Sequence, residues 1–281
     1  MNVTILGCRS GMPAHGQASS GYLVSIGGGA EETRVLLDCG PGVATALSSL
    51  IDPAMLDAIV LSHVHLDHCY DLLPIGKSLL AKGLSYPTAG RPPQSSVEIR
   101  RVPLYVPAGS AALFHRLAAL FPVTTVPALD RAFELAFDMH EYDPGDYFTV
   151  GSAEVHLELL AHAAPNCGVR VSCADGTLAY TGDTGRTPAL RTLARGADLL
   201  LAECTLSEPD SGPHGHLCAE DAADVAADAA VGQLVLTHFG TADPDWLEAS
   251  RRRAAVRFGG PVHIATPSAR FPVRSAREAM L

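Results

Sequence analysis

AIVLSHVHLDHCYDLL, residues 58–73, places three histidines and an aspartate directly after an aliphatic run. The run AIVLS is typical of a buried β-strand. Because side chains alternate along a strand, His63 and His65 project to the same side at the point where it ends. Asp67 and His68 follow on the turn into the next helix. Four side chains of metal-binding type are therefore expected at one strand end.

This cluster predicts a metal centre. Burying several imidazoles without partners is costly, and a divalent metal removes that cost by accepting their lone pairs. The pattern His-x-His-x-Asp-His supplies two neighbouring pairs, His63 with His65 and Asp67 with His68. Two pairs of ligands indicate two metal ions.

Further ligands are expected at other strand ends. His162 ends EVHLELLAH, and His238 ends QLVLTH. Asp183 lies in TGDTG, where the glycines let the backbone turn sharply beneath a carboxylate. All three follow one pattern, an aliphatic strand with a ligand-type side chain directly after it. They are the candidates to complete a two-metal site.

The composition limits the possible partners. The chain has 281 residues, of which 47% are hydrophobic and 18% charged, and its formal net charge is -10. That charge gives no general attraction to polyphosphate, which argues against non-specific binding to nucleic acid or to a membrane. The size permits a large core, and we expect residues 1–281 to form a single domain.

The cysteines and the start of the chain predict a cytoplasmic protein. The seven cysteines are scattered without a CxxC pair, so free thiols in a reducing compartment are expected. MNVTILGCRSG lacks the charged and apolar regions of a secretory signal, and no apolar run approaches the roughly 20 residues that span a bilayer.

The order of elements predicts two stacked sheets. Strand patterns are concentrated at the start of each half and then give way to alternating strands and helices, which favours an αββα sandwich of two mixed β-sheets flanked by helices. Strands are expected at 3–7, 21–27, 33–40, 58–63, 103–107, 133–139, 146–150, 154–162, 168–174, 177–185, 198–203, 233–239 and 261–266. Helices are expected at 43–51, 69–84, 110–121, 187–197, 219–230 and 246–258.

Two further features are visible along the chain. Residues 82–102 are rich in Pro, Gly and Ser and locally basic, which indicates a solvated loop, with a lid over the site as the alternative. The segments AIVLSHVH and QLVLTHFG are both aliphatic strands that end in Ser/Thr-His, which suggests an internal duplication.

HVHLDH, His162, the Gly-Asp-Thr-Gly around Asp183, and His238 occur in that order. This order resembles the metallo-β-lactamase superfamily, and it implies the metallo-β-lactamase fold for nearly the whole chain. Three other segments resemble the RNase Z-like phosphodiesterase branch of that superfamily. They are LGCRSGMPAHGQASSGYLV, HAAPNCGVR and GHLCAEDAADVA.

The resemblance implies roles for individual residues. Metal one would be held by His63, His65, His162 and Asp183, and metal two by Asp67, His68, Asp183 and His238. Ligands without thiolate suit two divalent ions, with Zn²⁺ expected and Mn²⁺ or Fe as alternatives. Such a pair would hold a bridging hydroxide as nucleophile.

The proton transfers are assigned on the same basis. Asp67, beside the hydroxide, would act as base or orienting group. His216 matches the non-ligand histidine of the branch and is the candidate general acid, with His214 as its competitor. His15 lies on the glycine-bearing loop expected to border the site, where exposure or a substrate contact are the two interpretations. Cys69 and Cys167 adjoin site motifs and are expected to be packing residues.

The chain also departs from the branch. Enzymes that mature tRNA usually carry a long Gly/Pro-rich arm before GDTG, whereas residues 163–182 read here as two strands joined by Ala-Asp-Gly. An acidic protein without that arm favours a small phosphodiester of the cyclic-nucleotide kind over tRNA. The alternatives are an RNase Z-type tRNA 3′ endoribonuclease, a lactonase or arylsulfatase, and a non-catalytic metal-binding scaffold. The resemblance also implies a homodimer.

Overall fold

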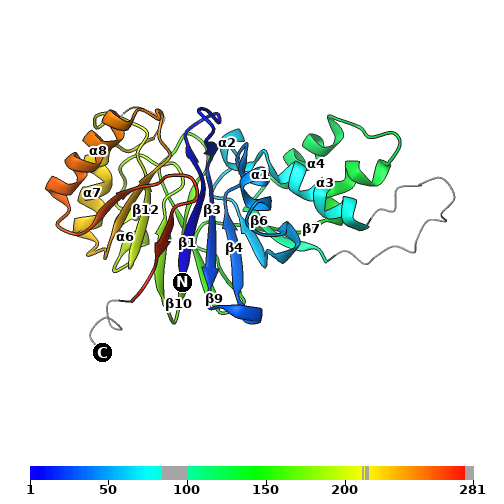
Figure 1. The fold of residues 1–281 in the computed structure, drawn as a ribbon, viewed down its shortest axis with the longest axis horizontal. Helices are drawn as coiled ribbons and strands as arrows, with labels where there is room; N and C mark the ends of the chain where they lie inside the picture. The colour runs from blue at the N-terminus through cyan, green and yellow to red at the C-terminus, as the bar shows by residue number, and fades with distance from the viewer. Residues whose placement is uncertain (84–99, 211, 213–214, 276–281) are drawn as a thin grey trace.

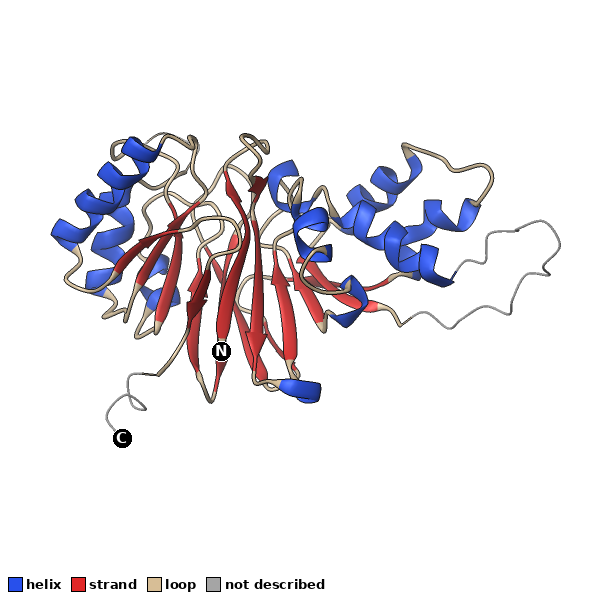
Figure 2. Ribbon diagram, viewed as in Figure 1, coloured by secondary structure: helices blue, strands red, loops and turns tan. Residues whose placement is uncertain are grey.

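Two β-sheets packed face to face form the centre of the computed structural model, which describes residues 1–83, 100–210, 212 and 215–275. Helices cover the outer face of each sheet, as Figure 1 and Figure 2 show. The predicted αββα sandwich of two mixed sheets is confirmed. The individual elements are as follows.

The first sheet has the order β15 (Arg270–Pro272), β1 (Asn2–Arg9), β3 (Gly21–Ile26), β4 (Thr33–Leu37), β5 (Ala58–Val60), β6 (Val102–Pro107) and β7 (Phe137–Tyr142), with β2 (Ala18–Ser19) paired to β1. The second has the order β14 (Val262–Ile264), β13 (Leu234–Thr237), β12 (Leu199–Glu203), β11 (Gly176–Tyr180), β10 (Cys167–Cys173), β9 (Ala153–Leu159) and β8 (Tyr147–Val150).

Helices α1 (Val43–Ser48), α2 (Leu66–Cys69), α3 (Leu72–Gly83), α4 (Ala111–Ala119) and α5 (Ala132–Leu135) lie beside the first sheet. Helices α6 (Ala189–Ala194), α7 (Ala219–Asp228) and α8 (Pro244–Arg257) lie beside the second. Three 3₁₀ turns are η1 (Gly29–Glu31), η2 (Pro53–Met55) and η3 (Pro127–Arg131).

Both faces of the central strands are buried. In β4, Val35 and Leu37 point into the core between the sheets, whereas Leu36 packs in the core under α1 and α3. Parallel strands covered on both sides need apolar residues at successive positions. This explains why the parallel strands of both halves read as continuous aliphatic runs.

The two sheets repeat one strand order. In β1, β3, β4, β5, β6 and β7 the successive pairings are two antiparallel and then three parallel. The strands β9 to β14 repeat this series. β5 is the fourth strand of its series and β13 the fifth, so AIVLSHVH and QLVLTHFG do not occupy equivalent positions. The repeated strand order of the two sheets is therefore independent of the similarity between these two short segments.

The predicted strand at 133–139 is wrong in its first half. Residues Ala132–Leu135 form α5, and β7 begins only at Phe137. Phe133 is buried and its ring lies 5.2 Å from Phe114 and 5.6 Å from Phe137, measured between centroids. Packing against the neighbouring helix outweighs the alternating pattern of Phe133 and Leu135. β15, at the edge of the first sheet, was not predicted.

The strand ends bring the predicted ligands to one edge of the sandwich. Asp38 follows β4, His63 lies three residues beyond β5, and Asp183 lies three residues beyond β11. Glu203 ends β12 and His238 directly follows β13. These strands run parallel within their sheets, so their carboxyl ends meet on the same side.

Gly40 is required for the close approach of two loops at this edge. A Cβ atom at Gly40 would overlap the main-chain carbonyl oxygen of Asp67. We expect Gly40→Ala to displace the segment that carries Asp67 and His68, and to lower the free energy of unfolding by about 1–3 kcal/mol. Chemical denaturation measures this. Gly259→Ala is the control, because a Cβ there meets no atom within 4 Å. Equal stability of the two variants would contradict the prediction.

Candidate metal centre

The structure brings the seven predicted ligands into two groups. The first consists of His63, His65, His162 and Asp183, and the second of Asp67, His68, Asp183 and His238. Within each group the ligand atoms lie within 4.8 Å of one another, and Asp183 belongs to both. These are the two sets that the sequence resemblance implied. Their role as metal ligands remains a prediction.

Asp183 lies between the two groups and presents one oxygen to each. Its Oδ1 is 3.3 Å from His68 Nε2 and 3.2 Å from His238 Nε2. Its Oδ2 is 3.8 Å from His63 Nε2 and 3.9 Å from His162 Nε2. A carboxylate in this position can bridge two cations.

The spacing of the donor atoms fits divalent metals. His65 Nδ1 and His162 Nε2 are 3.2 Å apart, and His68 Nε2 and His238 Nε2 are 3.3 Å apart. Two nitrogens bound to one tetrahedral Zn²⁺ would lie about 3.3 Å apart. In addition, His63 Nε2 and Asp183 Oδ1 are buried and have no hydrogen-bond partner. A cation bound at this place would be a partner for both atoms.

Four of the histidines are held through their second ring nitrogen. The Nδ1 atoms of His63 and His68 lie 3.0 Å from Ser62 Oγ and 2.7 Å from Asp38 Oδ2. Those of His162 and His238 lie 2.9 Å from the Gly215 carbonyl oxygen and 2.9 Å from Thr205 Oγ1. Because Nδ1 is occupied, each ring turns Nε2 toward the centre.

The electrostatics favour a neutral His63 and an ionised Asp183. Burial lowers the pKa of His63 well below its ordinary value, and the charge of His68 lowers it further. Burial raises the pKa of Asp183, but the charges of His238 and His68 outweigh this and hold it well below its ordinary value. Neutral imidazole and carboxylate are the forms that bind metal.

His216 lies beside the two groups with a separate partner. Its ring centroid is 5.1 Å from that of His162 and 5.9 Å from that of His238. Its Nδ1 is 2.8 Å from Oε1 of Glu203, a fully buried carboxylate. Burial lowers the pKa of His216, but the hydrogen bond and the charge of Glu203 outweigh this and raise it. A protonated imidazole next to the metal ligands can donate a proton.

Sequence reasoning missed Asp38 and Glu203. Asp38 is fully buried and accepts hydrogen bonds from Ser62 N at 2.7 Å and Tyr180 Oη at 2.5 Å, besides its contact with His68. Glu203 accepts from the main-chain N–H of Thr184 and from the hydroxyl of Thr205. Both follow the pattern used to find the ligands, since TRVLLD and DLLLAE are aliphatic strands that end in a carboxylate.

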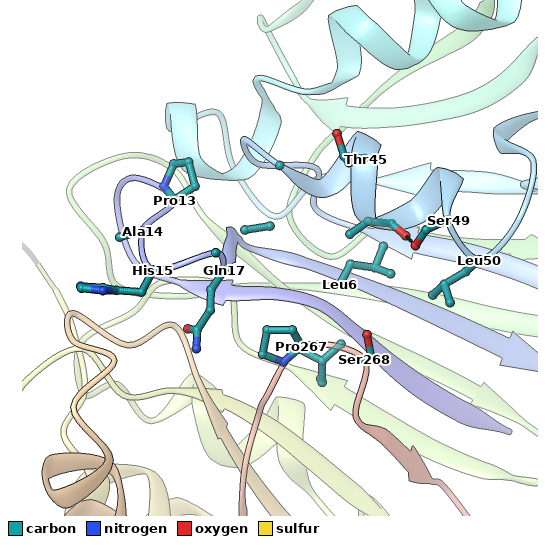
Figure 3. Close-up of a pocket in the computed structure, with 15 residues that line it drawn as sticks. Leu6, Pro13, Ala14, His15, Gln17, Thr45, Ser49, Leu50, Pro267 and Ser268 are labelled. Atoms are coloured by element: carbon teal, nitrogen blue, oxygen red, sulfur yellow. Dashed lines mark hydrogen bonds between the residues drawn. The ribbon is translucent and has the colours of Figure 1, made fainter.

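His15 lines a cavity that the predicted ligands do not line. This cavity has a volume of about 700 Å³ and is also bordered by residues such as Pro13, Gln17, Thr45 and Pro267 (Figure 3). None of the predicted ligands is among the residues that line this cavity. The side chain of His15 is exposed, and its contact with a substrate stays a prediction.

The other predicted features are partly described. His214 lies outside the described residues, and so does most of the loop 82–102, including Arg91. Arg100 and Arg101, at the end of that loop, pair with Asp57 at 3.1 Å and with Asp138 at 3.8 Å. Cys69 and Cys167 are free thiols buried in the core, as all seven cysteines are free. Burial raises the pKa of Cys69 to about 12, as expected for a packing residue.

Comparison with known proteins shows the family of the chain. Residues 33–239 match the model of the beta-lactamase superfamily domain. The chain belongs to the metallo-β-lactamase superfamily. It is 33% identical to the uncharacterized protein Rv1339 of Mycobacterium tuberculosis, over 98% of this chain and 93% of that protein. It is 32% identical to a ribonuclease Z of Bradyrhizobium, over 85% and 90%.

A third relative links sequence and structure. The chain is 29% identical to the probable metallo-hydrolase YhfI of Bacillus subtilis, over 94% of this chain and 97% of that protein. The crystal structure of YhfI superposes with a TM-score of 0.78 and covers 96% of this chain and 98% of its own. Membership of the superfamily, with relatives in the RNase Z-like branch, is confirmed. No helix in the described part of the chain is both long and apolar enough to cross a lipid bilayer.

We expect Asp38 to set the metal affinity of the second group through His68. Asp38→Asn replaces a charged acceptor with a neutral amide, and the affinity for Zn²⁺ should fall about 10- to 100-fold. Competition with a chromophoric chelator measures this. Asp138→Asn, an exposed carboxylate at the edge of the first sheet, should leave the affinity unchanged. Equal affinity of both variants would show that Asp38 is only a structural residue.

Proposed function

We propose that the chain is a binuclear metal-dependent phosphodiesterase that acts on small phosphodiesters. One observation carries the proposal. Two groups of ligand atoms share Asp183, and a histidine that belongs to neither predicted ligand set, His216, lies directly beside them on a buried carboxylate. This arrangement supplies both a place for two cations and a separate proton donor, which is what cleavage of a phosphodiester requires.

The residues of the chain would hold the ions in two sets. His63, His65, His162 and Asp183 would hold the first, and Asp67, His68, Asp183 and His238 the second, with Zn²⁺ as the expected metal. When bound, two such ions activate a water molecule and neutralise charge on the phosphoryl oxygens. The remaining steps rest on groups of the protein itself.

Asp67 orients the attacking water. Its Oδ2 accepts a hydrogen bond of 2.7 Å from the main-chain N–H of Gly11 and lies 3.2 Å from His238 Nε2. Burial raises the pKa of Asp67, but the contacts with His238 and His68 outweigh this and lower it. An ionised carboxylate fixed in this way would accept a hydrogen bond from the attacking water and orient it.

His216 protonates the leaving group. Glu203 occupies Nδ1 of its imidazole, so the proton that can be donated is the one on Nε2. Glu203 is itself fixed by the N–H of Thr184, directly after Asp183 in the sequence. The proton donor is thereby tied to the turn that carries the shared carboxylate.

Three features support a small substrate over tRNA. Between His162 and Asp183 the chain forms only the antiparallel strands β10 and β11, as the sequence predicted. The net charge is -10, so the phosphates of a long polyanion meet little general attraction. A cavity of about 390 Å³ opens beside His162, a volume suited to a small molecule.

The proposal is tested with metal-loaded protein and three substrate classes. Hydrolysis of bis(p-nitrophenyl) phosphate and of a cyclic nucleotide is expected, without turnover of an acyl lactone or an aryl sulfate. Turnover of the lactone alone would show that the protein is a lactonase, and turnover of the sulfate ester alone would show that it is an arylsulfatase. Retention of metal with no turnover of any substrate would indicate a binding scaffold.

A second candidate is tRNA 3′ processing, which the identity of 32% to a ribonuclease Z favours. It is tested by incubation with a precursor tRNA that carries a 3′ extension. Cleavage directly after the discriminator base, at a rate above that for the cyclic nucleotide, would make tRNA the preferred substrate class. We expect no such cleavage.

Two variants separate metal binding from proton transfer. Asp183→Ala should lose metal and activity together, because both groups depend on this carboxylate. His216→Ala should keep its metal and lose about 10²- to 10⁴-fold in the rate of cyclic-nucleotide hydrolysis. The loss should be much smaller for bis(p-nitrophenyl) phosphate, because p-nitrophenolate leaves without a proton. Elemental analysis and both assays measure this, and loss of metal in His216→Ala would show that His216 is a ligand.

Glu203→Gln tests the partner of His216. The substitution keeps the side-chain volume but removes the charge that raises the pKa of His216. We expect the rate with a cyclic nucleotide to fall at least tenfold at unchanged metal content, with little change for the p-nitrophenyl ester. Glu208→Gln, an exposed carboxylate nearby in the chain, serves as the control. Equal losses with both substrates would contradict a role in leaving-group protonation.

A further inference from the structure

Arg186 stands at the rim of the candidate centre. It follows the turn that carries Asp183, and that turn is fixed by two hydrogen bonds. Thr184 N donates to Glu203 Oε1 at 2.9 Å, and Gly185 N donates to the Ala161 carbonyl oxygen at 2.6 Å. Because the main chain is held at Thr184 and Gly185, directly before Arg186, the starting point of the Arg186 side chain is fixed relative to the metal ligands.

Arg186 and the metal ligand His162 line the same cavity of about 390 Å³. Its other described walls include Gly185, Asp210 and Gly215. Among the described residues that line this cavity, Arg186 is the one arginine or lysine. Gly215 directly precedes His216, so the cavity lies on the side where the leaving group would depart.

A buried carboxylate orients the guanidinium. Arg186 Nη1 lies 3.1 Å from Asp221 Oδ1, and the side chains are 62% and 1% exposed. The other oxygen of Asp221 is occupied by the N–H of Cys218 at the start of α7. The guanidinium is thus ion-paired on one side, and its exposed remainder stays available to a second acceptor.

An ordinary surface ion pair explains these contacts less well. An arginine this exposed adds little to stability. In such a role its partner would be expected at the surface, whereas Asp221 is almost fully buried. A guanidinium anchored at one side and open at the other is the arrangement that binds phosphate through paired N–H donors.

We propose that Arg186 forms an anion-binding subsite next to the scissile bond, and that the preferred substrates are small phosphodiesters with a second phosphoryl group. This rests on the proposed function for the reaction, but the subsite itself is a statement about binding. A dinucleotide with a terminal phosphate has this chemistry, and a dinucleoside monophosphate lacks it.

The binding test uses adenosine 3′,5′-bisphosphate and adenosine 5′-monophosphate as probes. Titration calorimetry of the metal-loaded wild type should show tighter binding of the bisphosphate by at least about tenfold. Arg186→Gln should abolish this preference. Arg191→Gln is the matched control, because Arg191 is equally an exposed arginine but does not line the cavity beside His162; it shares with Arg186 only a second cavity, which Asp224 and Asp228 also line. It should keep the preference of the wild type.

The kinetic test compares pApA and ApAp with ApA. At least one phosphorylated dinucleotide should exceed ApA in kcat/KM by about tenfold or more, and Arg186→Gln should remove the difference. Equal binding of the two nucleotides by the wild type, or a preference that survives in Arg186→Gln, would overturn the subsite. Loss of the binding preference in Arg186→Gln, with no dinucleotide cleaved by any protein, would uphold the subsite and refute the phosphodiesterase.

Discussion

The buried carboxylate of Asp183 lies between two groups of imidazoles, and the geometry of the whole centre depends on it. One oxygen faces His68 and His238, and the other faces His63 and His162. A buried charge is tolerated only where charges or hydrogen-bond donors surround it. Those surroundings come from both sheets, because His63 and His68 follow β5 whereas His238 follows β13. The face-to-face packing of the sheets is therefore also the condition for the site.

Around this centre, a second set of side chains fixes the imidazoles in place. Asp38, Ser62 and Thr205 each occupy the nitrogen of a histidine that points away from the centre. Asp38 comes from the strand next to β5, and Thr205 follows the strand next to β13. Neighbouring parallel strands thus supply a ligand and its support as a pair. Such support limits ring rotation, so that the donor atoms are placed before any ion binds.

The sequence predicted those features whose residues lie close together in the chain, and it missed those that depend on contacts between distant segments. The ligands were found because HVHLDH concentrates four of them in six residues, and the others follow aliphatic strands. Asp38 and Glu203 follow strands too, but a lone carboxylate at a strand end is common. Their roles depend on which strands are neighbours, which no short segment encodes. The strand predicted at 133–139 failed for a similar reason, since the burial of Phe133 against Phe114 is a contact between distant segments.

The charge balance of the chain bears on its substrate. The protein carries a net charge of -10, yet a phosphodiester anion has to enter the centre. Two divalent ions would bring four positive charges against the carboxylates of Asp67 and Asp183, so the centre itself would be positive within an acidic molecule. Attraction of this kind acts over a short range at physiological ionic strength.

Any phosphate beyond the scissile one meets the acidic surroundings unless a cation stands nearby. Arg186 lines the cavity next to His162, and its anchoring by Asp221 makes it the cation that would extend the positive region. The same balance that disfavours a long polyanion thus favours a compact substrate with a second phosphate close to the first.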